Sequence, residues 1–225
     1  MNVIIAGDFA PRARLAQQIE EEKFNEIFQN QLIEIIDSAD YSIVNLEAPI
    51  TEKDYKPITK CGPNLACTEG VVDALKFAKF SAVTLANNHI LDYGAEGVRK
   101  TMSCCLDGGL DVVGVGENLK EAGKILYVKR KGKILAVINC CEHEFSIATD
   151  SAAGANPLNP IAQFYKIKEA KEKADFVLVI VHGGHEHFQL PSPRMQETYR
   201  FFVDTGADAV VNHHQHCYSG YEFYK

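Results

Sequence analysis

Residues 176–187 read FVLVIVHGGHEH, an apolar run that passes directly into a cluster of histidines and one glutamate. The run Phe176–Val181 is rich in β-branched side chains, which is typical of a strand buried in a sheet. The polar residues begin at His182, where such a strand would end. Open α/β sheets hold their ligands beyond the carboxyl ends of their strands. The stretch therefore predicts both a sheet and the edge of that sheet where a site should lie.

Four more short apolar runs end in polar residues with metal-binding side chains. They are Val3–Ala6 before Asp8, Ile43–Val44 before Glu47, Val83–Ala86 before Asn88 and His89, and Ala209–Val211 before His214 and His216. Six of the eight histidines fall in the two clusters that follow residues 181 and 211. Helical patterns separate the apolar runs, which favours βαβ units and a largely parallel sheet.

The rest of the pattern predicts further elements. Apolar residues spaced three and four apart predict one amphipathic helix over residues 24–36. Thr68 and Asn159 are expected as N-caps, the latter followed by Pro160 in the first turn. The sequence at residues 131–133, Lys-Gly-Lys, predicts a hairpin turn. Further strands are expected at Phe80–Leu85, Asp111–Val113 and Ile134–Ile138, and the longest loop at residues 142–160.

Composition limits the classes of protein and partner. The chain has 225 residues, 46% of them hydrophobic, so it can bury a core, and we expect a single domain over residues 1–225. The net charge of −7 argues against nucleic acid or an anionic membrane surface as a partner, because both require basic patches. The apolar start is too short for a signal segment, and no run is long enough to span a bilayer. The oligomeric state stays open.

Cysteine usage indicates the redox environment. The seven cysteines are odd in number, include two adjacent pairs and form no Cys-x-x-Cys motif. This usage disfavours both a disulfide framework and a thiolate zinc site. We therefore expect free thiols and a cytoplasmic protein.

The polar residues at the strand ends are carboxylates, an amide and imidazoles. These oxygen and nitrogen donors suit a divalent transition metal, Mn²⁺, Fe or Zn²⁺. Alternate side chains on an extended backbone point the same way, so His214 and His216 are expected to reach neighbouring ions. Two such ions can activate a water and stabilise both the attacking and the leaving oxygen.

Single histidines and other nucleophiles offer different interpretations of this pattern. Any histidine taken singly is more often a hydrogen-bonded polar group than a ligand. His143 and His187 are expected not to be ligands, whereas His185 and His213 stay open. The chain has no Gly-x-Ser-x-Gly elbow, and no cysteine has an evident base partner in the sequence. These observations disfavour serine and cysteine nucleophiles.

Two longer motifs carry a resemblance to a known family, LANNHILDYGAEG at residues 85–97 and GADAVVNHHQH at residues 206–216. Together with shorter motifs around Glu47 and His182 they occur in the family's order, from Gly7 to the last residue. The chain resembles the CapA-like family of poly-γ-glutamate capsule synthesis proteins. The resemblance implies a calcineurin-like metallophosphatase fold, an α/β protein whose β-sandwich is flanked by helices in four layers, α/β/β/α. Family members continue into further strands, so C-terminal strands of the second sheet are expected to be missing.

The resemblance also implies the roles of individual residues. The metal ligands it implies are Asp8, Glu47, Asn88, His182, His214 and His216, with Glu47 bridging two ions. It implies His89 as the catalytic histidine and Asp92 as the carboxylate that orients its ring. Related phosphoesterases carry a histidine two residues after the first aspartate, where this chain has Ala10. One or two bound ions are therefore expected.

Two classes of function stay open at this point. The first is a metal-dependent hydrolase linked to capsule or poly-γ-glutamate biosynthesis, which cleaves a phosphoester, or alternatively a γ-glutamyl amide, with a metal-activated water. The second is a non-enzymatic capsule or polymer assembly subunit that retains a metal-binding fold. The partner expected for the enzyme is an anionic small molecule or polymer. Lys60, Asn64 and Arg194 are candidate substrate contacts, although surface loop charges explain them equally well.

Overall fold

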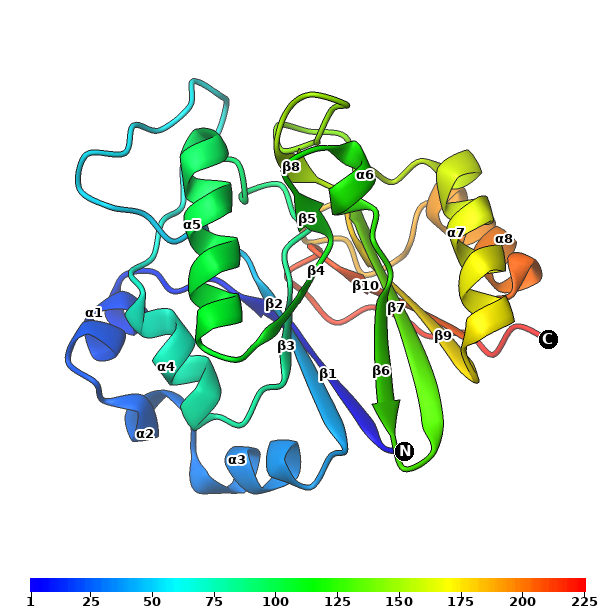
Figure 1. Cartoon of the computed structure of the whole chain (residues 1–225), viewed down its shortest axis with the longest axis horizontal. Helices are drawn as coiled ribbons and strands as arrows, with labels where there is room; N and C mark the ends of the chain where they lie inside the picture. Colours follow the sequence, from blue (N-terminus) through cyan, green and yellow to red (C-terminus); the bar gives the residue numbers. More distant parts are fainter.

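The computed structural model describes residues 1–225 and contains two four-stranded sheets that face each other between layers of helices (Figure 1). The first sheet has the order β1-β2-β3-β4 and all its pairs are parallel. The second has the order β10-β9-β7-β6, with only the β6–β7 pair antiparallel. The strands of the first sheet are β1 (Val3–Phe9), β2 (Tyr41–Leu46), β3 (Ala82–Thr84) and β4 (Asp111–Val113). The strands of the second are β6 (Leu126–Arg130), β7 (Lys133–Cys141), β9 (Phe176–His182) and β10 (Ala209–His213).

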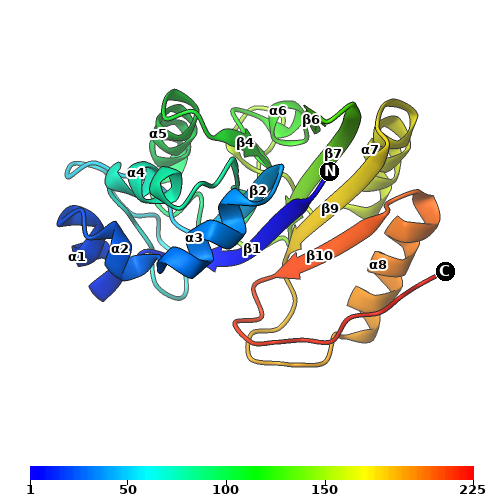
Figure 2. The ribbon, with the colours of Figure 1, turned by 90° about the horizontal axis from the view of Figure 1, so that it is seen from below.

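The helices divide between the two outer faces. Those of the first sheet are α1 (Arg14–Glu20), α2 (Phe24–Ile27), α3 (Asn30–Asp37), α4 (Gly70–Phe77) and α5 (Gly94–Asp107). The second sheet is covered by α7 (Pro160–Lys173) and α8 (Pro193–Thr205), as the view from below shows (Figure 2). The short elements α6 (Leu119–Ala122), β5 (Val115–Gly116) and β8 (Gly154–Ala155) lie above the sheets.

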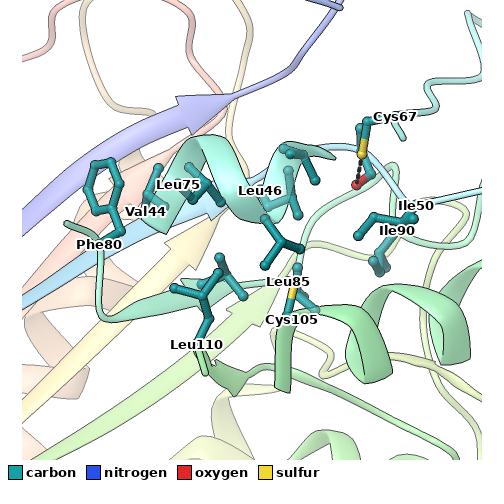
Figure 3. Packing of buried hydrophobic residues seen from close by; sticks show 14 of the residues in the cluster. Val44, Leu46, Ile50, Cys67, Leu75, Phe80, Leu85, Ile90, Cys105 and Leu110 are labelled. Atoms are coloured by element: carbon teal, nitrogen blue, oxygen red, sulfur yellow. Dashed lines mark hydrogen bonds between the residues drawn. The ribbon is translucent and has the colours of Figure 1, made fainter. Parts of the chain in front are cut away.

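Three apolar layers hold the four layers of backbone together. Alternate residues of β2 belong to two of these layers. Val44 and Leu46 belong to the cluster that contains Leu75 of α4 (Figure 3). Tyr41 and Ile43 point to the other face and pack against the second sheet. A third cluster packs the second sheet against α7 and α8. The predicted α/β/β/α arrangement is therefore confirmed. No helix combines the length and the apolar character that a bilayer crossing requires.

Two local predictions were wrong and two were confirmed. The single helix predicted over residues 24–36 is split into α2 and α3, because Phe28 adopts an extended backbone and stacks its buried ring on Phe9 at 5.7 Å. Thr68 does not cap α4, which has Glu69 at that position and no side-chain cap. Asn159 does cap α7, accepting the N–H groups of residues 161 and 162. The predicted hairpin turn joins β6 to β7, with residues 131 and 132 both at positive φ.

Gly114 allows the chain to pass closely over the second sheet. It adopts φ 93°, and a Cβ there would lie 2.0 Å from Oδ1 of Asn139. That same oxygen accepts the N–H of Ala86 at 2.8 Å, and Nδ2 of Asn139 donates to the carbonyl of Ile180 at 3.1 Å. Asn139 thus ties the two sheets together directly before the Asn-Asn-His motif.

We expect Gly114→Ala to lower the free energy of unfolding by about 3 kcal/mol or more, since it combines positive-φ strain with a clash against the buried side chain of Asn139. Gly132→Ala is the matched control, because Gly132 has φ 72° but open space around its Cα. It should cost only about 1 kcal/mol. Urea denaturation of both variants measures the difference, and equal costs would contradict the role given to the Asn139 contact.

Burial separates the cysteines into two reactivity classes. Cys67, Cys105, Cys140 and Cys141 are buried, whereas Cys61 is exposed. Burial raises the pKa of Cys140 to about 12, so its reactive thiolate is scarce at neutral pH.

A thiol reagent should therefore modify Cys61 of the native protein quickly and the four buried cysteines only after unfolding. Peptide mapping of the labelled protein identifies the sites, and Cys61→Ser should remove the fastest phase. Rapid native labelling at Cys140 would show that the core around β7 opens readily.

Candidate active site

The carboxyl ends of strands from both sheets bring the polar clusters to one edge. Asp8 lies opposite Asn45 in the β1–β2 register, and His213 lies opposite His182 in the β10–β9 register. Because β1 belongs to one sheet and β9 to the other, the site forms across the interface between the two sheets.

His182 is the centre of the cluster and is almost fully buried. Its Nδ1 lies 3.5 Å from Oδ1 of Asp8, and its Nε2 lies 3.5 Å from Oε1 of Glu47. The same Nε2 is 3.1 Å from Oδ1 of Asn88 and 3.1 Å from Nδ1 of His214. Four of the other five metal ligands that the resemblance implied therefore surround this imidazole.

The electrostatics of this cluster are dominated by two carboxylates, the buried Glu47 and the half-buried Asp8. Burial raises the pKa of Asp8, but the hydrogen bond and the charge of His182 outweigh it, so the pKa lies well below its ordinary value. For His182, burial lowers the pKa, and the stronger opposing effect of Asp8 and Glu47 raises it to about 9. A proton on His182 thus balances the carboxylates, and a cation bound there would take over that role.

The prediction of how the sixth ligand, His216, would be positioned beside His214 was wrong. An extended His-x-His was expected, but β10 ends at His213, and both His214 and His216 adopt positive φ, 94° and 52°. The two rings still lie 5.9 Å apart. Turns rather than strand alternation therefore bring the two imidazoles together.

Three groups of side chains have ligand atoms close enough to share a metal ion, all within 4.8 Å of one another. They are Glu47, His182 and His214; Asp8, Glu47 and His216; and Glu186, His187 and His216. The first two share Glu47, the residue to which the resemblance gave a bridging role. All members of the third are exposed, and it includes His187, which was expected not to be a ligand. His143 belongs to none of them.

Buried amides beneath the site were not singled out from the sequence. Asn45 donates from Nδ2 to Oδ1 of Asp8 at 2.7 Å. Asn87 donates to the carbonyl of Leu46 at 2.9 Å and accepts the N–H of His89 at 3.1 Å. Both residues lie in the polar clusters at the strand ends, which was the available signal. They hold the segments that carry Glu47 and His89.

Two further polar residues approach the cluster. His213, left open from the sequence, is 7% exposed, and its Nδ1 has no hydrogen bond and lies 3.8 Å from Oδ1 of Asp8. Glu144 accepts from Nδ2 of Asn88 at 3.2 Å and lies 3.8 Å from Nε2 of His214. Glu144 comes from the long loop after β7, whose length was the only sequence signal.

Beside the cluster, His89 and Asp92 form a pair in which Nδ1 of His89 lies 2.7 Å from Oδ2 of Asp92. Lys60 is ion-paired with Asp92. Asn64 donates to the carbonyl of Ile58 at 3.0 Å and thus closes its own loop. The substrate roles suggested for Lys60 and Asn64 stay predictions.

Arg194, the third candidate substrate contact, lies at the outer rim. Its side chain is 72% exposed and donates to Oε1 of Glu142 at 2.5 Å. The other oxygen of Glu142 accepts the N–H of Gly184 at 3.0 Å, close to the end of β9. A substrate role for Arg194 also stays a prediction.

Solved structures share the fold. The chain superposes on a candidate 5′-nucleotidase from Staphylococcus aureus in complex with α-ketoglutarate with a TM-score of 0.54 at 15% identity, covering 96% of this chain and 46% of that one. For a novel phosphatase from Mycoplasma pneumoniae the TM-score is 0.50 at 16% identity, covering 96% and 64%. The chain therefore has a metallophosphatase-like fold, and at these identities the likeness extends to the fold alone.

Sequence relatives give the family. The chain is 36% identical over 196 residues to the capsule biosynthesis protein CapA of Bacillus anthracis, covering 84% of this chain and 48% of that protein. It is 32% identical over 215 residues to the PGA biosynthesis protein CapA of Bacillus subtilis, covering 94% and 56%. The chain thus spans about half the length of the curated relatives it matches. Because the model of the bacterial capsule synthesis protein PGA_cap matches residues 2–225, the chain belongs to that family.

Proposed function

We propose that this chain is a metal-dependent hydrolase linked to capsule or poly-γ-glutamate biosynthesis, with a phosphoester as its substrate and a γ-glutamyl amide as the alternative. The observation that carries the proposal is the convergence of two carboxylates, an amide and a second imidazole on His182, all within 3.5 Å of its ring. Placing two carboxylates close together away from water costs free energy unless positive charge or a bound cation compensates them.

The donor set fits one or two divalent transition ions. The groups that share Glu47 offer only oxygen and nitrogen donors, which suit Mn²⁺, Fe or Zn²⁺. Glu47, His182 and His214 would hold one ion, Asp8, Glu47 and His216 a second, and Asn88 adds an amide oxygen. When bound, such ions lower the pKa of water and neutralise charge on phosphoryl oxygens.

The His89–Asp92 pair supports proton transfer beside the cluster. If Nδ1–H of His89 donates to the carboxylate of Asp92 at 2.7 Å, Nε2 is the nitrogen that can hold or release a proton. The backbone N–H of His89 donates to Oδ1 of Asn87, so the residue is held both at its backbone and at Nδ1 of its ring. On this proposal the bare Nε2 of His89 takes a proton from the attacking water and passes it to the leaving oxygen.

The family supports an anionic substrate, a small molecule or a polymer. The relatives' names refer to capsule and PGA biosynthesis, and a net charge of −7 leaves the site itself to attract an anion. The alternative is an assembly subunit without catalysis, and the relatives' names, which refer to biosynthesis and not to hydrolysis, favour it. Hydrolysis by the purified chain separates the two.

A cytoplasmic location stays a prediction, supported by seven free cysteines.

Protein purified without chelator should carry about one to two transition ions per chain. Glu47→Ala should lower this occupancy more than any other single change, since Glu47 belongs to two of the three groups that could hold an ion. His143→Ala is the control, because His143 is exposed and outside those groups. Elemental analysis after gel filtration measures both, and equal occupancy in the two variants would exclude Glu47 as the bridging ligand.

His89→Ala should retain the fold and most of the metal while losing about 10²–10⁴-fold in turnover, the usual contribution of a positioned acid or base. Asp92→Asn should lose less, and the double variant should be no slower than His89→Ala, because both residues act through one imidazole. Steady-state kinetics on a phosphoester that wild type hydrolyses tests this. If His89→Ala is as fast as wild type while Glu47→Ala is inactive, the proton-transfer role is wrong.

A further inference from the structure

Lys60 is a buried cation that the proposed chemistry does not use. Its side chain is only 2% exposed, and Nζ pairs with Oδ1 of Asp92, which is itself fully buried. Nζ also lies 3.2 Å from Nδ1 of His89 and 5.4 Å from the centre of the Phe145 ring. The ammonium is thus enclosed by Asp92, His89 and Phe145.

These contacts argue against Lys60 as the receptor for a substrate anion. Its charge is already balanced by a carboxylate, and moving it toward an incoming anion would leave that carboxylate buried without a countercharge. Breaking a buried ion pair by removing one partner costs several kcal/mol. Exposed Arg194 could turn toward an anion more easily, because its partner Glu142 keeps a hydrogen bond to Gly184.

Asp92 joins the loop before α4 to His89. Its Oδ2 accepts the N–H of Leu65 at 2.6 Å, and its backbone carbonyl accepts the N–H of Ile58 at 2.8 Å. Lys60 lies between these two loop residues and is bound to the other carboxylate oxygen. The carboxylate is therefore held on both oxygens, which fixes the direction in which Oδ2 meets the imidazole.

The two contacts of Nδ1 of His89 cannot both be favourable hydrogen bonds. An ammonium only donates and a carboxylate only accepts, so Nδ1 must carry its hydrogen toward Asp92 or be bare toward Lys60. The contact with Asp92 is the shorter, 2.7 Å against 3.2 Å. As long as Lys60 holds Oδ1 of Asp92, the tautomer with hydrogen on Nδ1 is favoured and Nε2 stays bare.

We propose that Lys60 is a positioning residue: through Asp92 it fixes the tautomer and orientation of the His89 ring, instead of binding substrate. The inference rests on the proposed function where it concerns turnover, but the state of the imidazole can be measured without turnover.

The kinetic test compares Lys60→Met with Lys56→Met, a change at an exposed lysine of the same loop. Lys60→Met should lower kcat by about 10–100-fold with KM nearly unchanged, the usual effect of losing a partner that orients a functional histidine. Lys56→Met should leave both constants unchanged. A large rise in KM for Lys60→Met with kcat retained would overturn the proposal and make Lys60 a substrate contact.

The spectroscopic test uses ¹⁵N-histidine-labelled full-length chain loaded with Zn²⁺, with the His89 signals identified by their loss in His89→Ala. Long-range ¹H–¹⁵N correlations should report hydrogen on Nδ1 and a bare Nε2 in wild type and in Lys56→Met. Lys60→Met should shift this pattern toward a mixture of tautomers, and an unchanged pattern would overturn the proposal. If Lys60→Met does not fold, Lys60→Gln, which removes the charge but keeps a hydrogen-bond donor, serves for the same comparison. A wild type without hydrolytic activity would count against the proposed function, while the ¹⁵N pattern would still decide the role of Lys60.

Discussion

Asp8 connects the two sheets at the edge where the polar strand ends meet, and the arrangement of the site depends on it. One oxygen accepts from Asn45 of its own sheet and faces His182 of the other, and the second accepts the N–H of His214 at 3.0 Å. A buried carboxylate requires donors or positive charge around it. His182 of β9 and the N–H of His214, which follows β10, meet this requirement for Asp8. The negative charge gathered there would also stabilise a bound cation.

The loops that complete this edge contain backbone strain. His187, His214 and His216 are non-glycine residues at positive φ, a conformation that costs about 1–2 kcal/mol each. Hydrogen bonds offset the cost, since the N–H of His214 donates to Asp8 and that of His187 to the carbonyl of Gln215 at 2.7 Å. The strain turns the rings of His214 and His216 toward the carboxylates instead of along the strand. Strained residues are common at functional sites, and here they coincide with the candidate ligands.

Asp92 has the same organising role for His89 that Asp8 has for the imidazole cluster. Asp92 is fully buried and Asp8 is half-buried, and in each carboxylate the two oxygens bind separate parts of the chain and face a histidine of the site. The fold alone does not assign a reaction, because one scaffold can serve hydrolysis in one protein and polymer assembly in another. These two carboxylates and their histidines, and not the fold, therefore support the proposed chemistry.

The sequence indicated the strands and most of the candidate site, and the resemblance to the family implied the four layers. Apolar runs that end in Asp8, Glu47, Asn88 and His182 identify strands, and ligands bind beyond the carboxyl ends of such strands, so these side chains could be selected from the sequence. The packing of the two sheets then decided that His182 meets Asp8 and Glu47. The family was likewise evident from the motifs around His89 and His214. Only the tertiary structure decided the break at Phe28, whose burial against Phe9 overrides helical spacing, and the left-handed turns at His214 and His216. Only the tertiary structure also shows the contacts of Lys60 with Asp92 and of Glu144 with Asn88. Both contacts join residues far apart in the chain and depend on the conformation of irregular loops. Such loops have no periodic pattern from which a sequence could predict their conformation.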